Sequence, residues 1–289
     1  MKRSAIFAGF AGALGLSAAV LAHHVQTPLS FLSGPNVLDT IQYHLKPGGV
    51  GVPPYLMVPE EFDHHAVVNV APGHSFTVSN GAGVNESVVF DTSDFANPAA
   101  PEIEEVLEAI SNRSTLLSGF YKNGHAFLRG EAAGSAAALT LTDGTGGPLT
   151  ALGFSAGTAT GSRLVPLEIS IPLDDHHGAN HDADLAFHPY RVFVSATAGT
   201  TVLDGQTLPI AFDDVTRIYY RAAIQGQLQG FLGTLNDTSD AKALLDLGPA
   251  AKGDLSQLPD ELYLAYAVYS MDGQAVEFVS NRFVVEFVK

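Results

Sequence analysis

The sequence predicts a mainly β protein with two domains. Glycine, threonine, serine, valine and proline are plentiful, and the 3.6-residue periodicity of amphipathic helices is scarce. Ten short segments show alternation or enrichment in β-branched and aromatic residues, and turn-forming residues bound them. Many short strands with frequent turns are typical of β-sandwiches. We expect strands at residues 65–72, 74–80, 86–91, 125–131, 138–143, 167–173, 191–197, 217–224, 261–270 and 283–288.

The first 22 residues have the pattern of a secretory signal peptide. Lys2 and Arg3 precede an uncharged run rich in Ala, Gly and Leu, and small or aliphatic residues lead up to His23. The alternative is a membrane anchor, but the run is short and weakly hydrophobic for a span. We therefore expect cleavage after Ala22 and a secreted or cell-surface protein without a transmembrane segment.

The composition excludes some classes of partner and chemistry. The chain carries 14 basic and 30 acidic residues, and its net charge of −16 would repel nucleic acid and anionic lipid. It has no cysteine, so disulfides and thiol chemistry are absent. A hydrophobic content of 46% with 15% charged residues favours packed cores over disorder.

One segment, residues 101–111, predicts an amphipathic helix. Pro101 and the acids after it suit a first helical turn, and apolar residues follow at i, i+3, i+4 and i+7. These apolar residues are Ile103, Val106, Leu107 and Ile110. Strands are predicted on both sides of the helix. This βαββ order would place the helix on one face of a small sheet.

The run "SVVFDTSDFANPAAPEIEEVLEAI…GHAFLRGEAAGSAAALTLTDGTGGPLTALGF" resembles a βαββ module that recurs in phage tail and capsid-decoration proteins and in flagellar hook-cap proteins. In that module an "F…DF" strand end precedes the helix and a "DG….LGF" segment closes the unit. The resemblance covers about residues 75–155. It implies a structural or surface-display module, and it supplies no catalytic residues.

The C-terminal part, about residues 186–289, is similar to an immunoglobulin-like sandwich found at the ends of secreted proteins of environmental bacteria. The similarity lies in "GFLGTLNDTSDAKALLDLGP" and "LYLAYAVYSMDGQAVEFVSNRFVVEF". The chain departs from that pattern at Ser239, where glycine is usual. The resemblance implies binding or architecture, and no turnover. A small, polar linker near residue 163 then divides a β-rich domain of residues 23–163, with the helix, from an immunoglobulin-like domain of residues 164–289.

A loop between two predicted strands gathers candidate metal ligands. Asn180, Asp182 and Asp184 alternate in a way that can direct oxygens toward calcium, whereas paired histidines could bind zinc or copper. A solvated loop without metal is the alternative, and catalysis would also need an open coordination position. The candidate ligands are Asp174, Asp175, His176, His177, Asn180, His181, Asp182, Asp184 and His188.

Three other motifs suggest chemistry only weakly. "GFSAG" at 153–157 matches a nucleophile elbow around Ser155, but a small-residue stretch and a strand follow it where a helix is required. Cleavage after Ala22 would expose His23 at the N-terminus, as in copper-dependent polysaccharide oxygenases, but these enzymes usually carry an aromatic platform and disulfides. The "DHH" cluster at 63–65 suits a solvated turn.

The sequence thus predicts a secreted, non-enzymatic structural or surface-associated protein that is self-assembling or adhesive. The alternatives are a glycan- or ligand-binding module and, less favoured, a copper oxygenase. A glycan-binding surface would need exposed aromatic rings, and the candidates are Tyr219, Tyr220, Tyr263, Tyr266 and Phe278. No catalytic residue or required cofactor is predicted.

Overall fold

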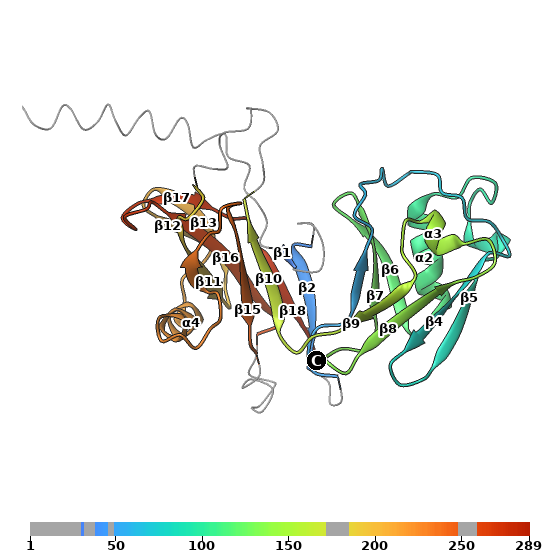
Figure 1. Ribbon diagram of the computed structural model, residues 1–289, viewed down its shortest axis with the longest axis horizontal. Helices are drawn as coiled ribbons and strands as arrows, with labels where there is room; N and C mark the ends of the chain where they lie inside the picture. Colours follow the sequence, from blue (N-terminus) through green and yellow to red (C-terminus); the bar gives the residue numbers. More distant parts are fainter. Residues whose placement is uncertain (1–29, 32–37, 46–48, 172–184, 248–258) are drawn as a thin grey trace, which may run out of the picture. The chain divides into compact units, whose positions relative to one another are not determined.

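The computed structural model describes residues 30–31, 38–45, 49–171, 185–247 and 259–289, and in these residues the protein is mainly β (Figure 1). Strands far outnumber helices there, which confirms the predicted class. No helix in this part of the chain is long and apolar enough to cross a membrane. The predicted signal peptide and the metal-binding loop, apart from its last residues, lie outside the described residues.

The chain forms two compact units that are each assembled from separate segments. In the described residues, the first unit contains Ile169–Ala241 and Leu264–Arg282, and the second contains Ser30–Glu168, Lys242–Tyr263 and Phe283–Lys289. The predicted boundary near residue 163 stays a prediction.

The second unit contains two antiparallel sheets, a parallel strand pair and most of a third group of strands. A four-stranded antiparallel sheet has the order β5-β4-β8-β9, and a three-stranded antiparallel sheet has the order β3-β7-β6. A third group, β1-β10-β15, involves the short β1. The strands of the two antiparallel sheets are β3 (Tyr55–Met57), β4 (Ser75–Asn80), β5 (Asn85–Val89), β6 (Leu117–Lys122), β7 (His125–Gly130), β8 (Ala138–Asp143) and β9 (Gly157–Thr160). The third group is β1 (Ser30–Phe31), β10 (Val165–Ser170) and β15 (Asp240–Leu245).

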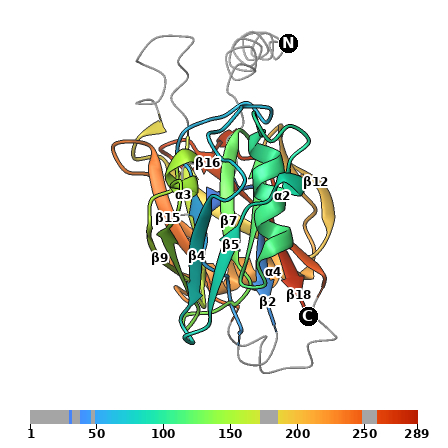
Figure 2. The same cartoon turned by 90° about the vertical axis from the view of Figure 1, so that its right-hand side faces the viewer.

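The predicted helix is present as α2 (Ile103–Arg113), two residues later than expected at each end. The carboxylate of Glu105 accepts a hydrogen bond from the backbone N–H of Glu102 at 3.0 Å, which satisfies one free donor of the first turn. The predicted apolar stripe is fully buried, and α2 contacts β5 and β6 (Figure 2). Its side chains join those of β4, β7 and β8 in one hydrophobic core. Burial of this apolar stripe therefore stabilises the helix and determines which of its faces points into the core.

The predicted placement of α2 on one small sheet is wrong. The strands that flank the helix in sequence belong to two sheets, because β7 pairs with β6 and β3 whereas β8 pairs with β4 and β9. Sequence reasoning missed β6, whose Ser and Gly residues hide its pattern. A short helix, α3 (Pro148–Ala151), and a 3₁₀ turn, η1 (Thr92–Asp94), complete this part of the unit.

A parallel pair joins strands from opposite ends of the described chain. β2 (Thr40–His44) pairs with β18 (Phe283–Val288) in register from Thr40 beside Val284 to His44 beside Val288. β18 also neighbours β16 (Glu261–Tyr269), whose first three residues belong to the second unit. The C-terminal strand thus has a partner on each side.

The first unit contains β11 (Pro189–Ser195), β14 (Leu232–Thr234), β17 (Val276–Val279) and most of β16, together with the hairpin of β12 (Ala198–Leu203) and β13 (Gln206–Ile210). Within it, β11 lies between β14 and β16, and β17 also pairs with β16. The immunoglobulin-like arrangement stays a prediction.

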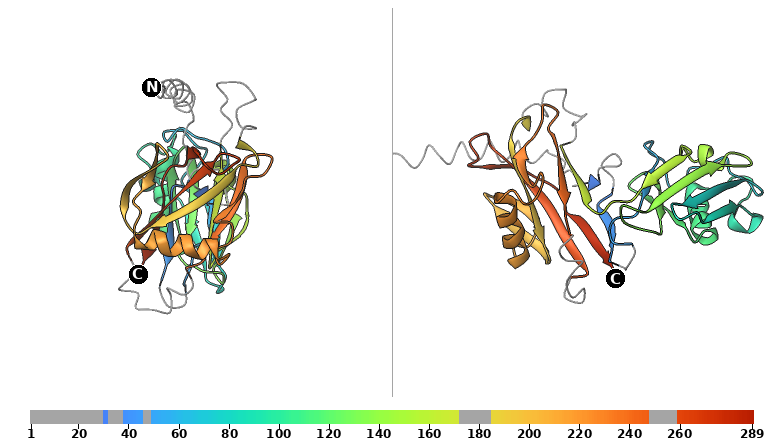
Figure 3. Two further views of the ribbon diagram at one scale, coloured as in Figure 1. Left: turned by 90° about the vertical axis from the view of Figure 1, so that its left-hand side faces the viewer. Right: turned by 60° about the horizontal axis from the view of Figure 1, so that its bottom comes forward.

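Two predicted strands are wrong. Residues 217–224 lie in α4 (Asp214–Ile224), which packs against β11 (Figure 3). Asp213 caps this helix by accepting a hydrogen bond from the backbone N–H of Thr216, a local signal that outweighs the strand propensity of Ile218 and the tyrosines. Residues 65–72 form no strand and contribute only an isolated bridge between Val67 and Glu102. The other eight predicted strands are present, two of them, β8 and the strand at Phe283–Val288, with the predicted bounds and the rest with shifted ends.

Candidate functional site

Of the nine predicted metal ligands, His188 is the one that the structure describes. It lies just before β11, and its side chain is 12% exposed. Its Nδ1 atom is 2.6 Å from Oε2 of Glu277 on β17 and 3.1 Å from the carbonyl oxygen of Tyr269 at the end of β16. Both partners accept hydrogen bonds, which favours the tautomer with the proton on Nδ1.

This contact determines which ring nitrogen of His188 is available for other ligands. When the ring is neutral with its proton on Nδ1, Nε2 carries the lone pair. A carboxylate on the far nitrogen is also how many metal-binding histidines are oriented. In the described part of the chain, no group of three or more His, Cys, Asp or Glu residues could hold a metal ion. The calcium or zinc site therefore stays a prediction, with His188 as its one placed member.

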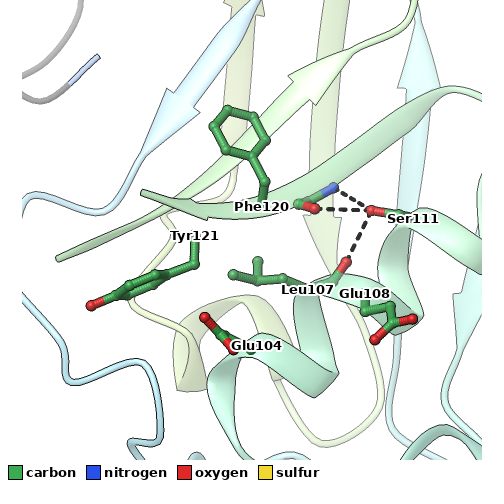
Figure 4. Close-up of a pocket in the computed structure, with 7 residues that line it drawn as sticks. Glu104, Leu107, Glu108, Ser111, Phe120 and Tyr121 are labelled. Atoms are coloured by element: carbon green, nitrogen blue, oxygen red, sulfur yellow. Dashed lines mark hydrogen bonds between the residues drawn. The ribbon is translucent and has the colours of Figure 1, made fainter. Parts of the chain in front are cut away.

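A shallow pocket of about 270 Å³ lies between α2 and β6 in the second unit (Figure 4). Glu104 and Glu108, one turn apart on α2, contribute carboxylates, and the buried Leu107 lies between them. Tyr121 contributes its ring from β6, and the Phe120 side chain points away from these groups. The remaining lining residues are Ser111 and Gly119.

The polar groups at the base of the pocket are engaged in structure. The hydroxyl of Ser111 donates to the carbonyl oxygens of Leu107 and Gly119 and accepts from the N–H of Gly119, at 2.9 to 3.1 Å. A side chain at Gly119 would meet the Leu107 carbonyl oxygen at 2.8 Å, so glycine permits the close approach of helix and strand. Ser111 therefore anchors α2 to β6.

The Tyr121 hydroxyl is engaged with the backbone. Its hydroxyl donates to the carbonyl oxygen of Phe62, and burial together with the negative charges of Asp63, Glu104 and Glu61 raises its pKa above the usual value. The pocket therefore offers carboxylates, an aromatic ring and an apolar base. Such a surface can bind a cationic group.

The "DHH" cluster is a solvated turn, as predicted. Asp63, His64 and His65 are exposed. His65 Nδ1 lies 2.6 Å from Oε2 of Glu102, and this hydrogen bond raises the pKa of His65. The rings of His64 and His65 are 3.9 Å apart. The pair has no third metal-binding partner in the described residues.

Ser155 does not lie in a nucleophile elbow. The segment that precedes it contains α3, and β9 follows it. The order of helix, turn and strand is the reverse of the strand, turn and helix that such a serine requires. The prediction that a strand and not a helix follows Ser155 is confirmed by β9.

The aromatic residues considered for glycan binding do not form an exposed platform. Tyr266 and Phe278 are buried and pack against each other, with ring centroids 5.8 Å apart. Tyr220 is half-buried against Phe193, with centroids 6.3 Å apart. Tyr219 and Tyr263 are also half-buried. Packing against other rings therefore accounts for Tyr266, Phe278 and Tyr220.

Sequence reasoning missed Glu277 and the pocket residues. Tyr269 and His188 are 81 positions apart in sequence, and no local pattern could place them together. No protein-family model matches the chain, and no curated protein matches its sequence significantly.

Proposed function

We propose that this is an exported, non-enzymatic structural or surface-associated protein whose copies associate through the edge of a β-sheet. Three sequence features support the proposal: the N-terminal leader pattern, the acidic composition and the resemblance to surface-display modules. The structural observation that supports it most directly is that β9 is an uncharged strand at the edge of its sheet.

β9 is an edge strand without charge. It pairs with β8 and with no other described strand, and three of its four residues, Gly157, Thr158 and Thr160, are exposed. The surrounding segment 153–162, "GFSAGTATGS", contains no charged residue and no proline. Natural edge strands usually carry lysine, proline or a bulge to prevent pairing with another chain. The absence of these residues from 153–162 favours such pairing.

The charge of the whole chain favours the same edge. Two copies that each carry a net charge of −16 repel one another over most of their surfaces. They can approach closely only where charged side chains are missing, and β9 meets this condition. Backbone hydrogen bonds between two β9 strands would then extend the sheet from one copy into the next.

Lysines at the edge should prevent association. We expect Thr158→Lys/Thr160→Lys to remain monomeric at concentrations at which the unchanged protein forms dimers or larger assemblies, because charges on an edge strand oppose pairing. Light scattering after size-exclusion chromatography measures the mass of each species. Electron microscopy of the concentrated protein shows whether filaments or lattices form.

The matched control changes the same residue type in the same sheet. Thr77 is exposed on β4, which lies between β5 and β8, so Thr77→Lys adds a charge without touching the edge. This variant should associate like the unchanged protein. A protein that stays monomeric at every concentration without any substitution would contradict the proposal.

A ligand-binding module is the second candidate. The pocket beside α2 favours it, because Glu104, Glu108 and Tyr121 together suit a cationic ligand. The copper oxygenase depends on His23, which lies outside the described residues. The association experiment separates the first two candidates, since a binder does not need to assemble.

A further inference from the structure

β2 and β18 form a parallel pair. The N-terminal end of β2 and the C-terminal end of β18 lie at opposite ends of this pair. The five paired positions run from Thr40 beside Val284 to His44 beside Val288. The chain enters β2 before Thr40 and leaves β18 after Val288. Tension applied across these two points therefore pulls the strands in opposite directions along their common axis.

The pair is bonded at both ends. At one end, the N–H of Val284 donates to the carbonyl oxygen of Asp39 at 2.8 Å, and at the other, the N–H of Leu45 donates to the carbonyl oxygen of Val288 at 2.8 Å. Between these bonds, Ile41 and Tyr43 on β2 are completely buried. Sliding one strand past the other would break all these bonds and contacts together.

Each strand is also tied to the rest of the second unit. The hydroxyl of Tyr43 donates to the carbonyl oxygen of Arg163 at 3.0 Å, and the ring of Tyr43 meets that of Phe287 edge-on with centroids 6.0 Å apart. The N–H of Phe287 donates to the carbonyl oxygen of Asp260 at 2.9 Å. Among the described strands β2 pairs with β18 alone, and His44 at its end also bridges Gly51 through two backbone hydrogen bonds.

We infer that the parallel pair of β2 and β18 is a load-bearing clamp that resists tension between the two ends of the described chain. In parallel strands the hydrogen bonds are evenly spaced, so shear loads them at the same time. Pulling the strands apart from one end would instead break them one after another. The clamp goes beyond the association of copies and holds whether or not β9 pairs between them.

Single-molecule stretching in two directions tests the clamp. The chain has no cysteine, so introduced cysteines are the only thiols for attaching handles. Asp39→Cys/Lys289→Cys places the handles at opposite ends of the pair and loads it in shear. Asp39→Cys/Arg282→Cys places both handles at the same end and unzips it. The shear variant should unfold at the higher force, with a distinct peak that the unzipping variant lacks.

Two measurements make the result decisive. If the two double-cysteine variants have equal melting temperatures, the difference in unfolding force comes from the direction of pulling and not from stability. If their melting temperatures differ, each variant is stretched at a temperature at which the two have the same free energy of unfolding. Val284→Pro removes the N–H that donates to Asp39, so it should lower the shear peak. A shear force equal to or below the unzipping force would overturn the inference, whatever the outcome for β9.

Discussion

A chain that begins at Gly49 is expected to lose most of the folding stability of a chain that begins at Leu38. The shorter chain lacks β2, including Ile41 and Tyr43, which are completely buried. Removing one large core side chain costs about 2–5 kcal/mol, and ordinary domains have only about 5–15 kcal/mol in total. The deletion also leaves β18 without its parallel partner. Urea unfolding of both chains, followed by circular dichroism, measures the difference.

The control restores the missing strand. A synthetic peptide of residues 38–45, added to the chain that begins at Gly49, should recover part of the lost stability in a concentration-dependent way. Equal free energies of unfolding for the two chains would mean that the packing of β2 contributes nothing to stability. The result also bears on the predicted boundary near residue 163, because a fragment of residues 164–289 separates β18 from β2.

Asp213→Ala is expected to lower the free energy of unfolding by about 2–4 kcal/mol, since it removes a helix cap and leaves buried donors without acceptors. One carboxylate oxygen accepts from the hydroxyls of Ser195 and Thr197 and from the N–H of Ala196, at 2.9 to 3.0 Å. The other accepts from the N–H and hydroxyl of Thr216 at 2.9 and 3.1 Å. Thr216 and Ser195 are buried, so the N–H of Thr216 would lose its acceptor and the Ser195 hydroxyl would keep only the carbonyl oxygen of Thr197 at 3.0 Å.

The cost of Asp213→Ala should depend on pH. Burial raises the pKa of Asp213, but hydrogen bonds from Thr216, Ser195 and Thr197 outweigh it and hold the pKa below its usual 3.8. The contribution of a carboxylate with a lowered pKa is complete above the unfolded pKa of about 3.9 and is lost as the pH falls through the folded value. The difference in melting temperature between the two proteins should therefore be larger at neutral pH than in strong acid.

The control for this prediction is a second variant of the same site. Asp213→Asn keeps an acceptor oxygen for the cap but has no titrating group, so it should cost less than Asp213→Ala and reduce the pH dependence of stability in the same range. If Asp213→Ala lowered the melting temperature by the same amount at every pH, a role for the ionised carboxylate would be contradicted.

The Asp213 site also shows where local sequence reasoning fails. The segment 217–224 has the β-branched and aromatic residues of a strand, yet Asp213 and Thr216 just before it form a helix cap. In α2 the apolar spacing and the acidic first turn agree, so that helix could be predicted. β6 could not be predicted, because its partner contacts and not its own composition make it a strand.

The candidate sites differ in the same way. The loop with the predicted metal ligands is visible in sequence as a cluster of histidine and aspartate. The contact of His188 with Glu277 is not visible there, because separate strands bring the two residues together. The pocket depends likewise on the approach of α2 to β6 at Gly119, which the residues of either element alone do not indicate.

The sequence by itself determined the mainly β class, eight of the eighteen described strands, the amphipathic helix and the acidic, cysteine-free composition. These properties follow from residue type and short-range periodicity, since burial repeats every two residues in a strand and every 3.6 in a helix. Only the tertiary structure decided which strands pair. β2 beside β18, two sheets around α2 and β9 at an edge result from burial and hydrogen bonding between segments far apart in the chain, and no local pattern records such partners.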